Sequence, residues 1–319
     1  MKMKRSFRPA VPATFMLAII TLAADAAPRS KSPAATSRPA GVSYGKAEQI
    51  AILANKQVHE SSGLACGRAN KDIFWTHNDS GDKARVFAFN GRGEHLATYN
   101  VPGAKARDWE DMCSFRLARR SVLLIGDVGD NASKRDHCTL YAINEPRLNP
   151  QRRNAQGSAS LLQTIHFRYS QGPQNCESIA FDVASRTIYI ITKVFGLRCN
   201  VYALPWPKRP EARTVVIKPV ATLAIPPATA MDISSDGRRA VVLTYGPAYE
   251  YTRTGGQTWA EAFAGKPRFL PMPGRRQGES ICYGPDGKKL YLTSEKLPTP
   301  LWRIPVLQAE PLKRPGGAK

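Results

Sequence analysis

The sequence predicts an all-β fold, a five-bladed β-propeller with four-stranded blades whose ring is closed by an N-terminal strand. The first observation is a repeat with copies starting at residues 60, 110, 177, 229 and 279, mostly about 50 residues apart. The second is that each copy contains an oxygen-bearing side chain, a half-apolar run, a polar turn and another apolar run, which is typical of a β-hairpin. The third is that further strand-like runs follow each hairpin. Such repeats are typical of propellers.

The hairpins are the most regular part of the repeat. The clearest copy is Glu279–Glu295, ESICYGPDGKKLYLTSE. Asp236-Gly237 and Asp286-Gly287 lie at matching places in two copies, and Asp-Gly between apolar runs is a strong hairpin signal. The other copies align with the clearest one almost without gaps, the last of them with one inserted residue: Glu177–Lys193, Glu110–Gly126, Thr229–Tyr245 and Glu60–His77.

Third and fourth strands follow the hairpins. We predict third strands at Val86–Phe89, Leu140–Ile143, Val201–Leu204, Tyr249–Tyr251 and Leu301–Ile304. We predict fourth strands at His95–Val101, Leu161–Tyr169, Val215–Ile225 and Pro267–Met272. The fifth repeat lacks a fourth strand, so we expect Glu48–Val58 to supply it and close the ring. The alternative is a sixth blade within Asn149–Gln174, but Asn149–Gly157 is polar and shows no hairpin.

The two ends of the chain lie outside the predicted domain of residues 46–307. Residues 1–26 have a basic start, an apolar run and the small-x-small sequence Ala24-Asp25-Ala26, which predict a cleaved signal peptide. The apolar run is shorter than the roughly 20 residues of a membrane span, so we expect cleavage rather than an anchor. Residues 27–45 and 308–319 have the composition of a disordered linker and a disordered basic tail. The protein is therefore expected to be exported, to the periplasm or the medium, with no membrane span in its mature form.

The chain is strongly basic, with 46 Lys and Arg against 25 Asp and Glu and a formal charge of +21. Such a surface favours anionic partners, here an anionic small molecule or an envelope polymer. A general bias of the proteome toward basic residues explains the same excess, and we prefer that explanation. The basic residues are scattered without an aromatic-interleaved stripe, so we expect no nucleic-acid binding. We expect a monomer.

Six cysteines in an exported chain suggest disulfides, with fifteen possible pairings. Cys138 and Cys199 both begin third strands, and Cys176 directly precedes a repeat start on the same predicted face. We therefore favour a Cys138–Cys199 or a Cys176–Cys199 bridge. The others are predicted to be buried small hydrophobic residues: Cys66, Cys113 and Cys282.

The residues that begin the repeats predict a metal site, because the inner strands of a propeller line its channel. Carboxylates held close together raise each other's pKa or recruit a cation. Calcium accepts six to eight oxygen ligands in flexible geometry, and the five His are too dispersed for a zinc site. The alternative is that each Glu caps backbone N–H groups or pairs with Arg107, Lys193 or Arg276. The predicted calcium ligands are Glu60, Glu110, Glu177, Thr229 and Glu279.

Polar loops after the second strands lead to the same mouth of the channel. We predict a catalytic group of His77, Asp127 and Lys193, with His77 as the general acid or base, because they follow equivalent strands. Turn chemistry is the alternative explanation for many of these polar residues. The predicted substrate-binding residues are Asn78, Asp79, Arg107, Asp130, Asn131, Arg135, Tyr245, Glu295 and Lys296.

The segments ESSGL, DWED and ESI, with HNDSG and GDVGDN between them, carry a resemblance to a known family. They resemble a largely uncharacterised family of secreted bacterial propeller proteins over nearly the whole mature chain. More loosely, one Glu or hydroxyl residue per blade around an axial ion is similar to the calcium-dependent propeller hydrolases of the nucleotidase, phytase and lactonase types. The substrate motifs of the nucleotidases and phytases are missing from this sequence.

Two functions follow from these patterns. The first is a metal-dependent hydrolase of a phosphate ester or another anionic small molecule, in which the ion polarises the scissile group and Lys193 and Arg135 hold the anion. The second is a non-catalytic propeller that binds an envelope polymer or a protein partner. The chain has no Gly-x-Ser-x-Gly or Ser-x-x-Lys nucleophile motif. An open cleft beside the ion would favour the enzyme, and a buried ion under a flat face would favour the scaffold.

Overall fold

The computed structural model describes residues 42–149, 151–209 and 213–307, all within one compact unit. The predicted signal peptide, the basic tail and most of the predicted linker lie outside these residues. The described end of that linker is ordered, because β1 (Ser43–Tyr44) pairs with β23 (Pro300–Leu307). Within the described ranges, no helix has the length and apolar character needed to cross a membrane.

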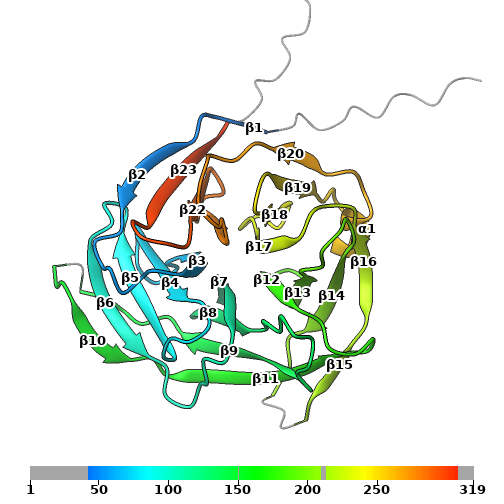
Figure 1. Cartoon of the computed structure of the whole chain (residues 1–319), viewed down its shortest axis with the longest axis horizontal. Helices are drawn as coiled ribbons and strands as arrows, with labels where there is room; N and C mark the ends of the chain where they lie inside the picture. Colours follow the sequence, from blue (N-terminus) through cyan, green and yellow to red (C-terminus); the bar gives the residue numbers. More distant parts are fainter. Residues whose placement is uncertain (1–41, 150, 210–212, 308–319) are drawn as a thin grey trace, which may run out of the picture. The chain divides into compact units, whose positions relative to one another are not determined.

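The fold is the predicted five-bladed propeller, with inner strands around a central channel (Figure 1). The first blade contains β3 (Ser61–Cys66), β4 (Ile73–Asn78), β5 (Arg85–Asn90) and β6 (His95–Asn100). The second contains β7 (Trp109–Leu117), β8 (Arg120–Asp127), β9 (Cys138–Asn144) and β11 (Leu161–Tyr169). The third contains β12 (Cys176–Asp182), β13 (Thr187–Thr192), β14 (Cys199–Pro205) and β16 (Pro219–Leu223).

The last two blades follow the same order from the channel outward. The fourth contains β17 (Ala228–Ile233), β18 (Arg239–Thr244), β19 (Ala248–Thr252) and β20 (Arg268–Leu270). A helix with a capping box, α1 (Trp259–Phe263), precedes β20 and buries its aromatic residues against the third and fourth blades. The fifth contains β21 (Ser280–Tyr283), β22 (Lys289–Thr293), β23 and β2 (Glu48–Ile52).

The ring closes as predicted. β2 pairs antiparallel with β23, from Glu48 opposite Arg303 to Ile52 opposite Pro300. The strand ends at Ile52 rather than at Val58, but Val58 is buried in the apolar cluster between the first and fifth blades. The N-terminal segment therefore completes the last blade without a covalent link.

Two extra strands extend the blades at their outer edges. β10 (Ala155–Ser158) pairs parallel to β6, and β15 (Val215–Ile217) pairs parallel to β11. The prediction of one strand over Val215–Ile225 was wrong, because its first part joins the second blade and its second part, β16, joins the third. Pro219 has no N–H and begins β16, a position that proline tolerates in a strand. The spacer before β12 holds only β10 and β11, so there is no sixth blade among the described residues.

A buried carboxylate ties the inner strands together. Asp111 Oδ2 accepts hydrogen bonds from Ile179 N at 2.8 Å and from Met231 N at 3.1 Å. These contacts join the second blade to the third and fourth. Burial raises the pKa of Asp111 well above its usual range, while the three backbone donors around it favour the ionised form. We infer that this side chain fixes the relative position of three blades.

All six cysteines are unbridged, so both favoured disulfides were wrong. The thiols of Cys138 and Cys199 instead contact backbone carbonyls, Val128 O at 3.7 Å and Pro226 O at 3.5 Å. The equivalent strand positions of the two cysteines therefore do not bring their sulfur atoms together. Cys176 is also buried and unbridged, and the three cysteines predicted to be buried small hydrophobic residues are buried: Cys66, Cys113 and Cys282.

Candidate functional site: an acidic channel mouth

The channel mouth is built from β-bulges at the start of the inner strands. In four blades the hairpin register shifts once there, which leaves one residue out of the ladder. Bulges change the direction of a side chain and are common beside functional sites. In the fifth blade Glu279 directly precedes β21. The bulged residues in the first four blades are Ser62, Glu110, Glu177 and Thr229.

Glu60 does not occupy the ring position that the sequence suggested, because Ser62 holds that position in the first blade. Glu60 O accepts the N–H of Asp79 at 3.0 Å, just as Asn175 O accepts the N–H of Lys193 at 3.0 Å. Glu60 is thus equivalent to Asn175, which lies two residues before the bulged Glu177. Its carboxylate is half-buried at the rim, 3.8 Å from the Lys296 ammonium.

The same backbone contacts identify a second ring position, directly after the second strand of each hairpin. Glu295 N donates to Gln277 O at 3.2 Å, in the same way as Asp79 N and Lys193 N donate to their partners. Asp79, Lys193 and Glu295 therefore leave equivalent strands. Two interleaved sets of side chains surround the mouth, one from the bulges and one from these exits.

Five carboxylates form the acidic mouth, four from the two sets and Asp108 from two residues before the bulge at Glu110. The oxygens of Asp79, Asp108 and Glu110 lie within 4.8 Å of one another, and so do those of Asp79, Glu279 and Glu295. Asp79 belongs to both groups, and either group is compact enough to hold a metal ion. Two of the predicted metal ligands, Glu110 and Glu279, are members. Asp79 and Glu295 had been predicted as substrate-binding residues, and Asp108 had no predicted role.

Burial and mutual repulsion raise the pKa values of these groups. The pKa of Glu279 rises to about 9, chiefly through burial and then through its hydrogen bond to Glu295. The pKa of Asp79 rises to about 6 through burial, with nearby carboxylates adding to the shift. Burial followed by the charge of Glu177 raises the pKa of Glu110 well above its usual range. These raised values favour the protonated carboxyl groups, and a bound cation would replace the protons.

Gly129 leaves space for two of the carboxylates. A Cβ atom at this position would overlap with Glu110 Oε1 and Asp108 Oδ2. The backbone of Gly129 is fixed from both sides, because its N–H donates to Asp108 O at 3.2 Å and its carbonyl accepts from Arg135 Nη1 at 2.8 Å. The absence of a side chain at residue 129 therefore lets both acids approach from the second blade.

A chain of polar contacts links the remaining ring positions. Lys193 Nζ forms a buried ion pair with Glu177 Oε1 and donates to Tyr245 Oη at 2.6 Å. Tyr245 Oη donates to Glu279 Oε1 at 2.9 Å. Glu177 Oε2 is buried without a hydrogen-bond partner among the described residues. The ion pair agrees with the alternative prediction that Lys193 neutralises a ring glutamate.

Thr229 is bulged like the ring glutamates but takes no part in either carboxylate group. Its side chain is buried, and Oγ1 donates to Gly278 O at 2.8 Å in the next blade. The hydroxyl therefore links the fourth and fifth blades.

His77 does not face Asp127 and Lys193. His77 pairs with Gly63, the residue after the bulge in the first blade. Asp127 pairs with Trp109, the residue before the bulge in the second blade. His77 therefore lies one position earlier on its strand than Asp127 does. A one-residue offset turns a side chain to the opposite face of a sheet. His77 is completely buried, packs edge-on against Trp109 at 5.4 Å between ring centroids, and has a pKa lowered to about 4 by burial. It is neutral and has no access to a substrate.

The other predicted catalytic group, Asp127, stabilises the loop after β8. Its Oδ1 accepts from Arg135 Nη1 at 2.9 Å and from Asp108 N at 3.0 Å. Asp130 accepts the N–H of Arg135 at 2.8 Å, and Asn131 accepts from Asn175 at 3.0 Å. These side chains hold the loop that carries Gly129.

The remaining predicted substrate-binding residues divide into two kinds. Asn78 is buried and donates to Gln57 O and to Asp82 Oδ2, both at 2.7 Å. Three others are exposed and reach solvent around the mouth: Arg107, Tyr245 and Lys296.

No protein-family model matches the chain, and no curated protein matches it significantly. The five-bladed architecture is the part of the predicted resemblance that the structure supports. The propeller architecture leaves the function open, because fold alone does not determine function, and the residues of the mouth carry the functional information.

Proposed function

We propose that this protein is an exported, calcium-binding β-propeller that presents the ion at its acidic mouth to an anionic ligand. The observation that carries the proposal is the pair of carboxylate groups that share Asp79, with oxygens within 4.8 Å of one another. Carboxylates that are buried this closely are unfavourable together unless protons or a cation neutralise them.

The donor set favours calcium over other metals. Only carboxylates make up the two groups, which suits a hard cation, and neither group contains the imidazole or thiolate ligands of zinc. The ligands come from three different blades and two kinds of loop, a flexible arrangement that calcium tolerates better than magnesium does. The close approach of the Glu110 and Asp108 oxygens over Gly129 and the unpartnered oxygen of Glu177 also support a cation at this mouth.

The ligand that meets the ion is proposed to be an anionic small molecule or an envelope polymer. Lys193 and the exposed Tyr245 border the acids on one side, and Arg107 and Lys296 are exposed side chains of the surrounding loops. Basic residues around a bound cation would attract phosphate, sulfate or carboxylate groups.

Hydrolysis of a phosphate ester is a second candidate function, and the environment of Asp79 favours it. This carboxylate is half-buried rather than enclosed, so an attacking water can reach it. Asp79 would take the proton of an attacking water in place of the enclosed His77, and Lys193 would orient the anion. A bound ion would polarise the scissile group.

Calcium titration of the chelator-treated protein by calorimetry tests the proposal. We expect saturable binding that Asp79→Asn weakens by about tenfold or more, since this residue belongs to both groups. Asp136→Asn removes the same charge from an exposed position and should bind like the wild type. Absence of calcium binding by the wild type would reject the proposal.

A phosphatase and lactonase screen with and without chelator then separates the two functions, because only the hydrolase shows calcium-dependent turnover that Asp79→Asn abolishes.

A further inference from the structure

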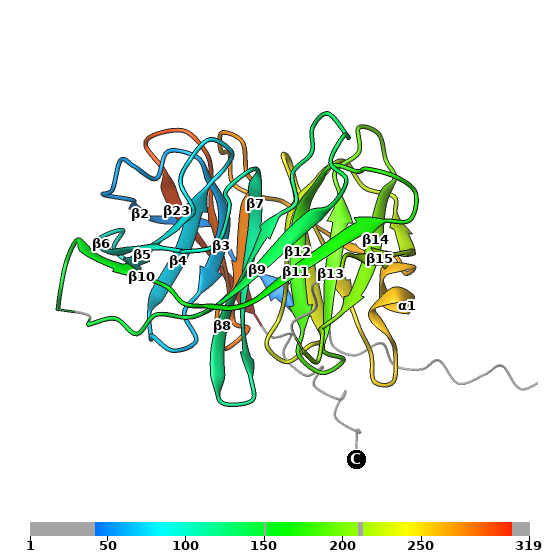
Figure 2. The same ribbon diagram turned by 90° about the horizontal axis from the view of Figure 1, so that it is seen from below.

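A cavity lies at the end of the inner strands opposite to the acidic mouth. The acids of the mouth stand at the starts of these strands, whereas this cavity is lined by the ends of β7, β12 and β17 and by the loop after β3. The β7–β8 hairpin extends beyond the ring on one face (Figure 2). The cavity measures about 480 Å³, within the usual range for small-molecule sites. We call it the far cavity.

Arg68 brings a fixed positive charge to the far cavity. Its Nε donates to Ser114 Oγ at 3.1 Å and Ser114 O at 3.3 Å, and its backbone N–H donates to Glu145 Oε2 at 2.8 Å. Within the part of the chain that the structure describes, no acceptor contacts the two terminal nitrogens of the guanidinium. The side chain is thus held in place while its carboxylate-binding edge is free.

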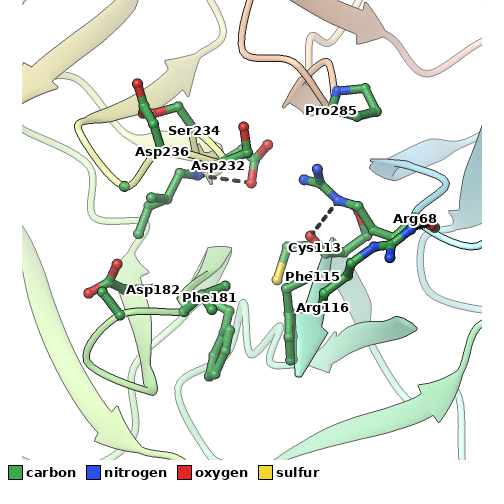
Figure 3. Close-up of a pocket in the computed structure, with 16 residues that line it drawn as sticks. Arg68, Cys113, Phe115, Arg116, Phe181, Asp182, Asp232, Ser234, Asp236 and Pro285 are labelled. Atoms are coloured by element: carbon green, nitrogen blue, oxygen red, sulfur yellow. Dashed lines mark hydrogen bonds between the residues drawn. The ribbon is translucent and has the colours of Figure 1, made fainter. Parts of the chain in front are cut away.

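Asp232 supplies the opposite charge. Its carboxylate accepts from Ile233 N and Tyr283 N, each at 2.8 Å, which leaves further lone pairs on both oxygens. Burial raises its pKa to about 6, so it is ionised at neutral pH. In the view of Figure 3, Arg68 and Asp232 approach the cavity from one side, and no ion pair joins them among the described residues.

The other side of the far cavity is aromatic. The rings of Phe115 and Phe181 stack with their centroids 3.8 Å apart, and Trp206 packs edge-on against both. Figure 3 shows the two phenyl groups across the cavity from Arg68 and Asp232. The site therefore combines a guanidinium, a carboxylate and an apolar wall.

We propose that the far cavity binds a small zwitterion, an α-amino acid with an apolar side chain. Its carboxylate would bind the free edge of Arg68, its ammonium group would face Asp232, and its side chain would pack on Phe115 and Phe181. The carboxylate of Asp232 disfavours dianions such as phosphate monoesters, and the Arg68 charge disfavours simple amines. This site is independent of calcium.

Ligand chemistry tests the proposal without changing the fold. We expect L-phenylalanine to bind in a calorimetric titration, and 3-phenylpropionate and phenethylamine, which each lack one charged group, to bind about ten- to a hundredfold more weakly. Arg68→Ala should cause a loss of the same size, while Arg119→Ala, an exposed arginine outside the cavity, should bind like the wild type. The proposal fails if no apolar amino acid binds at millimolar concentration, if 3-phenylpropionate binds as well, or if Arg68→Ala binds normally.

A different observation concerns two thiols where the ring closes. Cys66 Sγ on β3 and Cys282 Sγ on β21 lie 3.6 Å apart in the apolar cluster between the first and fifth blades. Sulfur atoms in contact need to approach by roughly 1.5 Å to reach the length of a disulfide bond. The two residues are far apart in the chain, so a bond between them would link the two blades that the N-terminal strand otherwise closes without a covalent link.

We also infer that Cys66 and Cys282 form a disulfide in an oxidising compartment. The two thiols lose two protons and two electrons to a small-molecule or protein disulfide, which is reduced to two thiols. Incubation with oxidised glutathione, acid quenching and peptide mapping should find the Cys66–Cys282 peptide pair, and a melting temperature above that of the reduced protein. Cys282→Ala should lose both effects, and Cys113→Ala, which removes another buried inner-strand thiol, should keep them. Recovery of both thiols unmodified after oxidation, or pairing of either with another cysteine, would overturn the inference.

Discussion

The acidic mouth and the far cavity lie at the two ends of the inner strands and differ in which charged side chains lack an ion-pair partner. At the acidic mouth, five carboxylates from three blades lie close to one another, and Lys193 is already paired with Glu177. At the far cavity Asp182 is paired with Arg253 at 2.9 Å, and the groups left open to a ligand are the Arg68 guanidinium and the Asp232 carboxylate. The comparison shows that the character of each end follows from the unpaired charges rather than from the net charge of +21. The acidic mouth suits a cation, and the far cavity suits a small zwitterion.

The largest effect is expected from removing the countercharge within the acidic mouth. Lys193→Met leaves Glu177 buried and unpaired, so in chelator the free energy of unfolding should fall by about 3 kcal/mol or more. Lys296→Met is the matched control, because the side chain of Lys296 is about half exposed and its ion pairs are long, and it should cost less than about 1 kcal/mol. Urea denaturation of both variants measures the difference. Equal losses would mean that Lys193 is not needed to neutralise the mouth.

An intermediate effect is expected from filling the space under the carboxylates. Gly129→Ala places a methyl group against Glu110 and Asp108, so calcium affinity should fall by about ten- to a hundredfold. Gly91→Ala adds the same methyl group where no atom lies within 4 Å, and should bind calcium like the wild type. Competition with a calcium indicator dye gives both affinities. Unchanged binding by Gly129→Ala would remove Glu110 and Asp108 from the ligand set.

A smaller, graded effect is expected from pH. The folded-state pKa values of Asp79, Glu177 and Glu279 are raised to about 6, 7 and 9. Groups with raised values contribute stability that is complete below their unfolded values, near pH 4, and that is lost as the pH rises through the folded values. In chelator, the melting temperature should therefore decline between about pH 5 and 9.

Calcium should reverse this decline, because it replaces the protons of the same carboxylates. Its affinity should rise by about tenfold or more from pH 5.5 to 8.5, with release of protons on binding. Calorimetry in two buffers of different ionisation enthalpy measures that release. A pH-independent affinity without proton release would place the ion away from these acids.

The fold was predictable from the sequence because one pattern repeats along the whole chain. The strand Leu161–Tyr169 has the predicted bounds, and the pairing of Glu48 with Arg303 confirms the predicted closure. Two Asp-Gly turns and regular apolar runs specify local hairpins, and the propeller follows from their number. The prediction failed at the outer edges of the blades, as at Val215–Ile225, which forms two strands in neighbouring blades instead of one.

The site was predictable only in part, because side-chain direction in a strand changes with every residue. The first hairpin aligns with the others only when the bulged residue is Ser62 and not Glu60. In this alignment His77 lies on a buried face of its strand. The position of a β-bulge depends on strand pairing and is not marked by a residue type in this sequence. Asp108 could have been found from its place two residues before Glu110, but its proximity to Asp79 depends on how two blades meet.

The most direct measurement is the anomalous scattering of crystals grown with calcium, or with a lanthanide in its place. We predict a peak at the acidic mouth, bonded to Asp79 oxygens at about 2.3–2.6 Å, and no metal peak in the far cavity. An acidic mouth without a peak at saturating calcium would contradict this prediction, and so would an ion held only by residues outside the two carboxylate groups.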